Sequence, residues 1–108
     1  MLTAREKSAL QKYISDSDDR LHVLFDALGE QNRCNMFRLF IKNTNLNVGE
    51  VAELLDITVP LASQHLKMLE GLAVLERRKI GREVFYKINE QDPVVQSLIR
   101  SILEVHIN

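Results

Sequence analysis

Three side chains that can hydrogen-bond to DNA, Ser63, Gln64 and Lys67, lie close together in residues 58–72. A glutamine amide can pair with both N6 and N7 of adenine, and a lysine ammonium is attracted to phosphate. The same stretch places other side chains at spacings of three and four, the pattern of a buried helix face: Leu61, Ala62, His65, Leu66 and Leu69. The stretch therefore predicts a short amphipathic helix that presents its polar side chains to DNA.

The start of this helix is a second candidate for DNA contact. Thr58 is a favoured N-cap residue, and Pro60 falls in the first turn, where its missing N–H costs little. Free amides at a helix N-terminus attract anions. We expect Thr58 and the amides of Val59, Leu61 and Ala62 to lie near a backbone phosphate.

A basic hairpin is predicted to follow. Val84, Tyr86 and Ile88 alternate with Glu83, Phe85 and Lys87, and residues 80–82 supply a turn that contains Gly81. Four cations surround that turn and are expected to contact phosphates or the minor groove: Arg77, Arg78, Lys79 and Arg82. Residues 58–88 carry six Lys and Arg against three Asp and Glu, a balance of +3 in a chain of net charge -1. The cations are concentrated where nucleic acid would bind.

Further helices must position the predicted recognition helix and hairpin. Apolar spacing and capping residues predict helices over residues 3–15, 20–28, 31–42 and 48–56, a turn over 43–47, and a last helix that starts at Asp92 and Pro93. The short connection between residues 56 and 58 is typical of a helix-turn-helix. We therefore expect a mainly α fold with a small β-hairpin, a winged helix-turn-helix, as one domain over residues 1–108.

The last helix is unusually apolar for its length. Val94, Val95, Leu98, Ile99, Ile102, Leu103 and Ile107 exceed what one small core should absorb. We therefore expect a homodimer in which the following residues lie in the interface: Leu21, Leu24, Phe25, Val95, Leu98, Ile99 and Ile102.

Composition narrows the class of protein. The 108 residues are 45% hydrophobic and 27% charged, which is ordinary for a globular domain. No apolar run approaches the roughly 18 residues of a membrane span, and charges near the start argue against a signal peptide. We expect a cytoplasmic protein with no membrane partner. The single Cys34 has no second thiol to resolve it and is interpreted as a small core residue. No residue pattern typical of an enzyme stands out.

Residues 51–88, VAELLDITVPLASQHLKMLEGLAVLERRKIGREVFYKI, resemble the DNA-binding half of the ArsR/SmtB family of bacterial transcription repressors. The preceding residues 24–40, LFDALGEQNRCNMFRLF, are similar to the family's helix leading into the core, and the resemblance spans residues 21–105. It implies a homodimer in which the first and last helices pair and two recognition helices read a palindromic operator in double-stranded DNA. By motif position, Ser63, Gln64 and His65 match the family's SerHisHis-type triplet, and Arg82 and Tyr86 match wing positions.

The chain departs from that family pattern at the recognition helix. Asp56 stands where the family commonly has Gly, and Asp tolerates the left-handed conformation better than most residues. Val59, Pro60 and Leu61 replace small polar residues, so thymine methyl contacts or DNA shape should carry more of the specificity. His65 is interpreted as a partly buried structural ring, and Tyr86 as packed beneath the wing.

The metal sites of relatives are also incomplete in this chain. Asn47 and Gly49 stand where metal-sensing relatives carry a CysValCys-like pair, and neither residue binds a soft metal. Asp92 is followed by Val94 instead of His at the interhelical zinc position, and His106 is followed only by Ile107 and Asn108. The resemblance therefore implies no metal and no cofactor, and leaves the effector unassigned.

The most favoured function is thus a sequence-specific DNA-binding transcriptional regulator, a homodimeric repressor without the usual metal sites. Two alternatives remain open. One is a winged-helix protein-interaction module that has lost DNA binding, which the acidic total charge and the apolar tip at Val59 to Leu61 motivate. The other is a sensor of the same family with a different effector site.

Overall fold

The computed structural model describes residues 1–16, 20–43 and 45–107, with side chains up to residue 105. The elements follow in the order α1 (Ala4–Ser15), α2 (Arg20–Leu28), α3 (Gln31–Lys42), β1 (Leu46–Asn47), α4 (Val48–Leu55), α5 (Val59–Gly71), β2 (Leu75–Ile80), β3 (Glu83–Ile88) and α6 (Pro93–Ile107). The predicted helices and hairpin are all present, which confirms the mainly α fold class. The side chains of His106 and Ile107 lie outside the described part.

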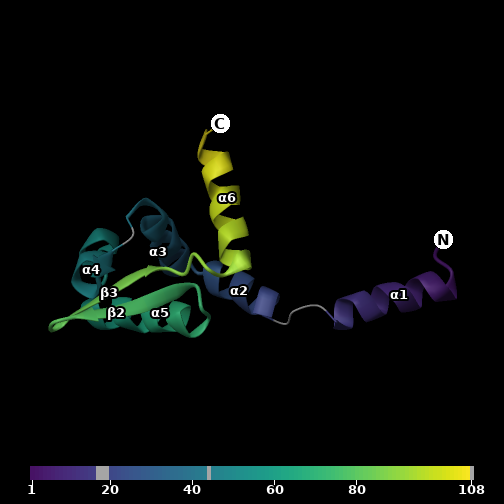
Figure 1. The fold of residues 1–108 in the computed structure, drawn as a ribbon, viewed down its shortest axis with the longest axis horizontal. Coiled ribbons are helices and arrows are strands. Elements are labelled where there is room, and N and C mark those ends of the chain that lie inside the picture. Colours follow the sequence, from purple (N-terminus) through teal and green to yellow (C-terminus); the bar gives the residue numbers. More distant parts are fainter. Residues whose placement is uncertain (17–19, 44, 108) are drawn as a thin grey trace.

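Helix α1 begins at the predicted capping box. The Thr3 hydroxyl accepts a hydrogen bond from the Glu6 amide at 3.1 Å, and the Glu6 carboxylate accepts one from the Thr3 amide at 3.1 Å. The helix buries no residue, and Leu10 and Ile14 are 50% and 70% exposed. Figure 1 shows α1 standing apart from the other helices, at the N-terminal end of the molecule.

A continuous apolar core joins the remaining helices to the sheet. Helix α3 contributes Met36, Phe37 and Phe40 to this core. The opposite side of α3 carries the exposed cations Arg38 and Lys42. The other buried side chains of this core come from α2, α4, α5, the turn after α5, the strands and α6: Leu24, Leu46, Val51, Ala52, Ala62, Leu66, Leu69, Val74, Leu75, Tyr86, Ile88 and Val95.

Two residues predicted for the dimer interface belong to this core instead. Leu24 is 1% exposed and Val95 is 0% exposed within the single chain, so neither has surface left to bury against a second protomer. That part of the prediction is wrong, because helical spacing identifies an apolar face but not the element that covers it. Leu98, Ile99 and Ile102 pack partly against the same core, whereas Leu21 and Phe25 are 43% and 56% exposed.

The sheet has a third strand that the sequence does not predict. Strand β1 occupies the end of the stretch expected to be only a turn, and it pairs antiparallel with β3 so that Leu46 lies opposite Tyr86. Tyr86 is 1% exposed, which confirms that it is packed beneath the wing. Its burial, and after that the charge of Glu70, raises the pKa of the Tyr86 hydroxyl. The base of the hairpin is therefore anchored to the helical body.

Two non-glycine residues with left-handed backbone conformations frame α5. Asp56 caps α4 at φ 53°, as predicted for the turn between the two helices of the motif. Ala73 has φ 61° just after α5, where its amide donates to Glu70 O at 3.0 Å and the Val74 amide donates to Leu69 O at 3.0 Å. Both turns direct the chain sharply, and they fix where α5 begins and ends.

Candidate nucleic-acid interface

Helix α5 has one buried face and one exposed face. Ala62, Leu66 and Leu69 are all 0% exposed and pack into the core. The opposite face is centred on Gln64, which is exposed together with Lys67. Ser63 is half-buried at the edge of this face. The predicted base-reading side chains Gln64 and Lys67 therefore point away from the body of the protein. Ser63 is less accessible to a partner because it is half-buried.

Two apolar side chains on the exposed surface were not predicted as DNA contacts. Met68 is 45% exposed on α5, one turn after Gln64, and Leu54 is 58% exposed on α4. Val59 and Leu61, which were predicted, are 53% and 36% exposed. The spacing of residues 61, 64 and 68 is the signal that could have identified Met68. This surface is suited to thymine methyl contacts as well as to hydrogen bonds.

The N-terminus of α5 is less available to a phosphate than predicted. The Leu61 amide donates to the Thr58 hydroxyl at 3.3 Å, and the Ala62 amide donates to Thr58 O at 2.9 Å. Thr58 is thus the N-cap, as predicted, but it occupies two of the three amides that were expected to face an anion. The expectation of a ready anion site there is wrong for Leu61 and Ala62.

His65 faces the body of the protein, as predicted for a structural ring. Its side chain is 13% exposed, and Nδ1 lies 3.2 Å from Arg33 Nη1 and 4.0 Å from Glu30 Oε2. The hydrogen bond from the Arg33 amide holds the pKa of Glu30 below its usual value, despite opposition from burial. These contacts join the start of α3 to the middle of α5. His65 therefore holds helices together, whereas Gln64 and Lys67 are exposed to solvent.

The four predicted cations of the wing are all exposed, but they do not form a single patch. In the hairpin, Arg77 lies opposite Tyr86, Arg78 opposite Phe85 and Lys79 opposite Val84. Because side chains alternate along a strand, Arg77 and Lys79 lie on one face and Arg78 on the other. Arg82 follows Gly81, which turns the chain at φ 63°. The wing therefore carries positive charge on both faces and at its tip.

The wing also contains one ion pair that reduces its free positive charge. Lys87 Nζ lies 3.5 Å from Glu76 Oε2, across the hairpin, and both side chains are about two-fifths exposed. An exposed pair of this kind contributes little to stability. Lys87 is consequently a poorer candidate for phosphate contact than the four cations nearer the tip.

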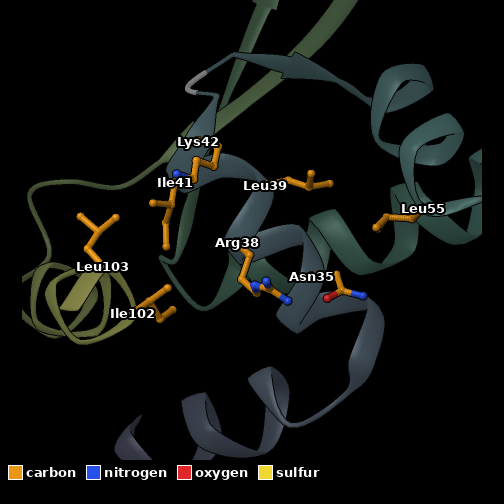
Figure 2. A pocket seen from close by; sticks show the side chains of 8 residues that line it. All are labelled: Asn35, Arg38, Leu39, Ile41, Lys42, Leu55, Ile102 and Leu103. Carbon is orange, nitrogen blue, oxygen red and sulfur yellow. The ribbon is translucent and has the colours of Figure 1, made fainter. Parts of the chain in front are cut away.

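An apolar groove lies elsewhere on the molecule. Figure 2 shows it between α3, the end of α4 and α6. Its volume is about 330 Å³. Its lining combines aliphatic side chains with one amide and two cations: Asn35, Arg38, Leu39, Ile41, Lys42, Leu55, Ile102 and Leu103. No residue of α5 or of the wing lines this groove. The exposed face of α5 and the groove are therefore distinct surfaces.

Comparison with known proteins identifies the family. A model described as bacterial regulatory protein, arsR family, matches residues 30–76. The transcriptional repressor PagR of Bacillus anthracis is 30% identical over 89 residues, which cover 82% of this chain and 85% of PagR. The chain belongs to the ArsR family. As an ArsR-family protein it is a DNA-binding transcriptional regulator, which confirms the function predicted from the sequence.

Solved structures share the fold of this ArsR-family chain, and a further relative resembles it in sequence. The crystal structure of PagR has a TM-score of 0.67 at 28% identity, with 83% of this chain and 98% of PagR aligned. A homodimeric winged helix-turn-helix DNA-binding domain from Mycobacterium bovis shares the fold, with a TM-score of 0.69 at 20% identity over 98% of this chain and 88% of that one. The arsenic resistance transcriptional regulator ArsR1 of Pseudomonas putida is 25% identical over 78% of this chain. That match spans only 66% of ArsR1 itself.

The residues at the metal positions of ArsR-family relatives do not fit a metal here. Asn47 is the N-cap of α4, where its side chain accepts from the Glu50 amide at 2.8 Å, and Gly49 has no side chain to offer. Asp92 binds the amides of Val94 and Val95 and pairs with Arg20. Within the described residues, no three His, Cys, Asp or Glu side chains are grouped so that they could hold a metal ion. Cys34 is half-buried on α3 and is not in a disulfide.

Among the described helices, none combines the length and apolar character that crossing a bilayer requires.

Proposed function

We propose that this ArsR-family regulator is a homodimeric repressor that binds a two-fold-symmetric operator. Helix α5 enters the major groove, and the wing contacts the flanking backbone or minor groove. The observation that carries the proposal is the exposed face of α5, centred on Gln64, beside a wing with cations on both faces. Gln64, Lys67, Val59, Leu61 and, at the edge, Ser63 read the bases, while Arg77, Arg78, Lys79 and Arg82 bind phosphate.

The dimer is proposed to form through α2 and α6. Leu21 and Phe25 on α2 are exposed, as are Leu103 and Val105 on α6 at 39% and 74%. Leu98, Ile99 and Ile102 on α6 are only partly buried where they pack against the core. Exposed apolar side chains on two helices favour burial against a second copy. To read two half-sites one turn of DNA apart, the two α5 helices of such a dimer must lie about 34 Å apart.

We further propose that the regulator acts in the cytoplasm, where its DNA lies. The α5 surface would select the operator, so sequencing the fragments that this protein enriches from a random duplex library should yield an inverted repeat. Half-sites spaced by one helical turn are expected for a symmetric helix-turn-helix dimer.

A binding titration tests the proposal. The purified protein is titrated against a random 30-base-pair duplex and against the enriched duplex, at low and moderate salt, with the oligomeric state measured by sedimentation. We expect a dimer that binds the random duplex weakly and the enriched duplex at least about a thousandfold more tightly. Absence of binding to either duplex at micromolar dimer would overturn the proposal.

That negative outcome would favour a protein-interaction module. The observation behind this second candidate is the apolar character of the DNA-facing surface, where Leu54 and Val59 are more than half exposed. A protein partner would bury these side chains and would not need the wing cations. Binding of a protein partner that survives alanine substitution of all four wing cations would support this second candidate.

A further inference from the structure

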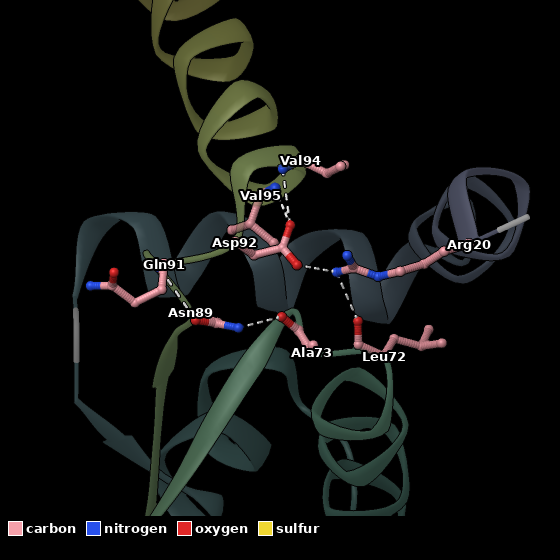
Figure 3. A network of polar contacts seen from close by, with 8 residues as sticks. All are labelled: Arg20, Leu72, Ala73, Asn89, Gln91, Asp92, Val94 and Val95. Carbon is pink, nitrogen blue, oxygen red and sulfur yellow. Dashed lines mark hydrogen bonds and ion pairs between the residues drawn. The ribbon is translucent and has the colours of Figure 1, made fainter. Parts of the chain in front are cut away.

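One guanidinium joins the recognition helix to the two helices proposed for the dimer. Figure 3 shows Arg20, the first residue of α2, between Leu72 and Asp92. Its Nη2 donates to Leu72 O at 3.2 Å and lies 2.5 Å from Asp92 Oδ2. Leu72 is the C-cap of α5, and Asp92 directly precedes α6. The ends of three helices therefore meet at one side chain.

The charges at this junction alternate in sign. The Leu72 carbonyl lies at the negative end of the α5 dipole and receives a cation. The Asp92 carboxylate lies at the positive end of α6, where Oδ1 accepts from the amides of Val94 at 2.9 Å and Val95 at 3.2 Å. The Asp92 side chain is 9% exposed and that of Arg20 is 30% exposed, so water screens the pair only partly. Removing the Arg20 guanidinium therefore takes this cation away from a carboxylate that is largely shielded from water.

Neighbouring hydrogen bonds make the junction rigid. Asn89 Nδ2 donates to Ala73 O at 3.0 Å, and the Asn89 amide donates to Val74 O at 3.0 Å. The Gln91 amide in turn donates to Asn89 Oδ1 at 3.3 Å. The segment that leaves α5 and the segment that enters α6 are thus tied to each other beside Arg20. A shift of α6 cannot leave the end of α5 where it is without breaking these contacts.

We propose that Arg20 is a positioning residue for DNA recognition, which sets the C-terminal end of α5 relative to α6 through Leu72 and Asp92. This inference rests on the proposed function. Base contacts demand side chains placed within about 0.5 Å, whereas contacts to phosphate tolerate more displacement. Loss of the junction therefore weakens discrimination between operator and random DNA more than it weakens binding to random DNA.

The test uses three substitutions at the pair and one control. Arg20→Gln removes the cation, and Asp92→Asn keeps an oxygen for the α6 amides but turns a second donor toward Arg20. The double variant completes a mutant cycle, and Arg20→Lys retains the charge. Arg100→Gln is the matched control, because Arg100 is an exposed arginine on α6 whose described contact is to Ser97 at 3.4 Å. Circular dichroism and sedimentation establish that each variant is folded and dimeric under assay conditions.

The readout is the ratio of affinities for the library-enriched duplex and a random duplex, together with the salt slope on each. We expect Arg20→Gln and Asp92→Asn each to lower this ratio about three- to thirtyfold with unchanged salt slopes. The double variant should be no worse than the more damaging single variant, and Arg20→Lys should recover part of the loss. Arg100→Gln should match the unmodified protein.

Several results would overturn the inference. They are an unchanged ratio in both single variants, an equal loss on the two duplexes, or additive losses in the double variant. If Arg20→Gln does not fold, Arg20→Lys and Asp92→Asn still decide the question in the same way. Failure of the unmodified protein to bind any duplex would instead refute the proposed function, so the two failures are distinguishable.

Discussion

Arg33 donates a hydrogen bond from Nη1 to Nδ1 of His65, with 3.2 Å between the two nitrogens. Since a guanidinium has no acceptor, His65 must accept at Nδ1 and carry its proton on Nε2. Arg33 Nε also donates to Ala27 O at 2.7 Å, at the end of α2. A single arginine thus connects α2, α3 and the inner face of the recognition helix.

The first prediction follows from that contact. His65→Ala leaves a part-buried Arg33 donor without its partner, and should lower the free energy of unfolding by about 1–3 kcal/mol. Urea denaturation of the dimer at fixed concentration measures it. Gln64→Ala, one residue away on the exposed face, should change stability by less than about 0.5 kcal/mol. Equal effects of the two substitutions would refute the assignment of His65 to a structural role.

The second prediction concerns base recognition by Gln64. Gln64→Ala should reduce discrimination between the enriched and the random duplex by about 1–3 kcal/mol if its amide makes a bidentate contact to adenine. Competition gel shifts with both duplexes provide the measurement. Selection with the variant should also relax preference at one base pair in each half-site. Weakening that is the same on both duplexes would argue against base readout by this side chain.

The third prediction concerns the wing. Arg78→Ala and Arg82→Ala should each weaken binding to all duplexes and reduce the slope of log affinity against log salt by about 1 per protomer that loses a phosphate contact. Lys42→Ala removes an exposed cation from α3, outside α5 and the wing, and serves as the control. A slope that stays the same in both wing variants would exclude the wing from the DNA interface.

The fourth prediction concerns the backbone after α5. Ala73 holds a left-handed conformation at φ 61°, which is unfavourable for a residue with a Cβ. Ala73→Gly should therefore raise the free energy of unfolding by about 0.5–1 kcal/mol, net of the added flexibility of the unfolded chain. Gly81→Ala, at φ 63° in the wing tip, should lower it. Thermal unfolding in parallel would reveal whether the two changes have opposite signs.

The fifth prediction concerns acid stability. Burial alone would raise the pKa of Asp92, but the hydrogen bond from Arg20 and those from the Val95 and Val94 amides outweigh it and leave the pKa lowered. A lowered folded pKa means stability that is present above the pKa of the unfolded Asp and is lost as pH falls through the folded value. Asp92→Asn should therefore flatten this part of the acid unfolding curve. If Asp92→Asn and the unmodified protein lose stability in the same way as the pH falls, the ion pair does not have this role.

Local signals in the sequence were sufficient for the helices and for the exposed face of α5. The Thr58 cap, the spacing of Ala62, Leu66 and Leu69, and the left-handed tolerance of Asp56 all depend on residues close together in the chain. The same holds for Gln64 and Lys67, whose exposure follows from the opposite face being apolar. Family membership was predicted from this region as well.

What could not be predicted depends on contacts between distant residues. Strand β1 exists because Leu46 meets Tyr86, forty positions later, inside a stretch whose Asn residues favour a turn. Leu24 and Val95 look like interface residues until the core that covers them is known. The meeting of Arg20 with Leu72 and Asp92 likewise requires the fold, since nothing in their separate neighbourhoods indicates it.

Strand β1 also limits how this protein can be engineered. Leu46 and Asn47 pair with the wing strand β3, and Asn47 then caps α4 with no residue between the two roles. A tag or a sensing loop inserted between residues 47 and 48 would separate the wing from the helix-turn-helix motif. An insertion ahead of Leu46 would leave that connection intact and makes the better fusion point for a reporter.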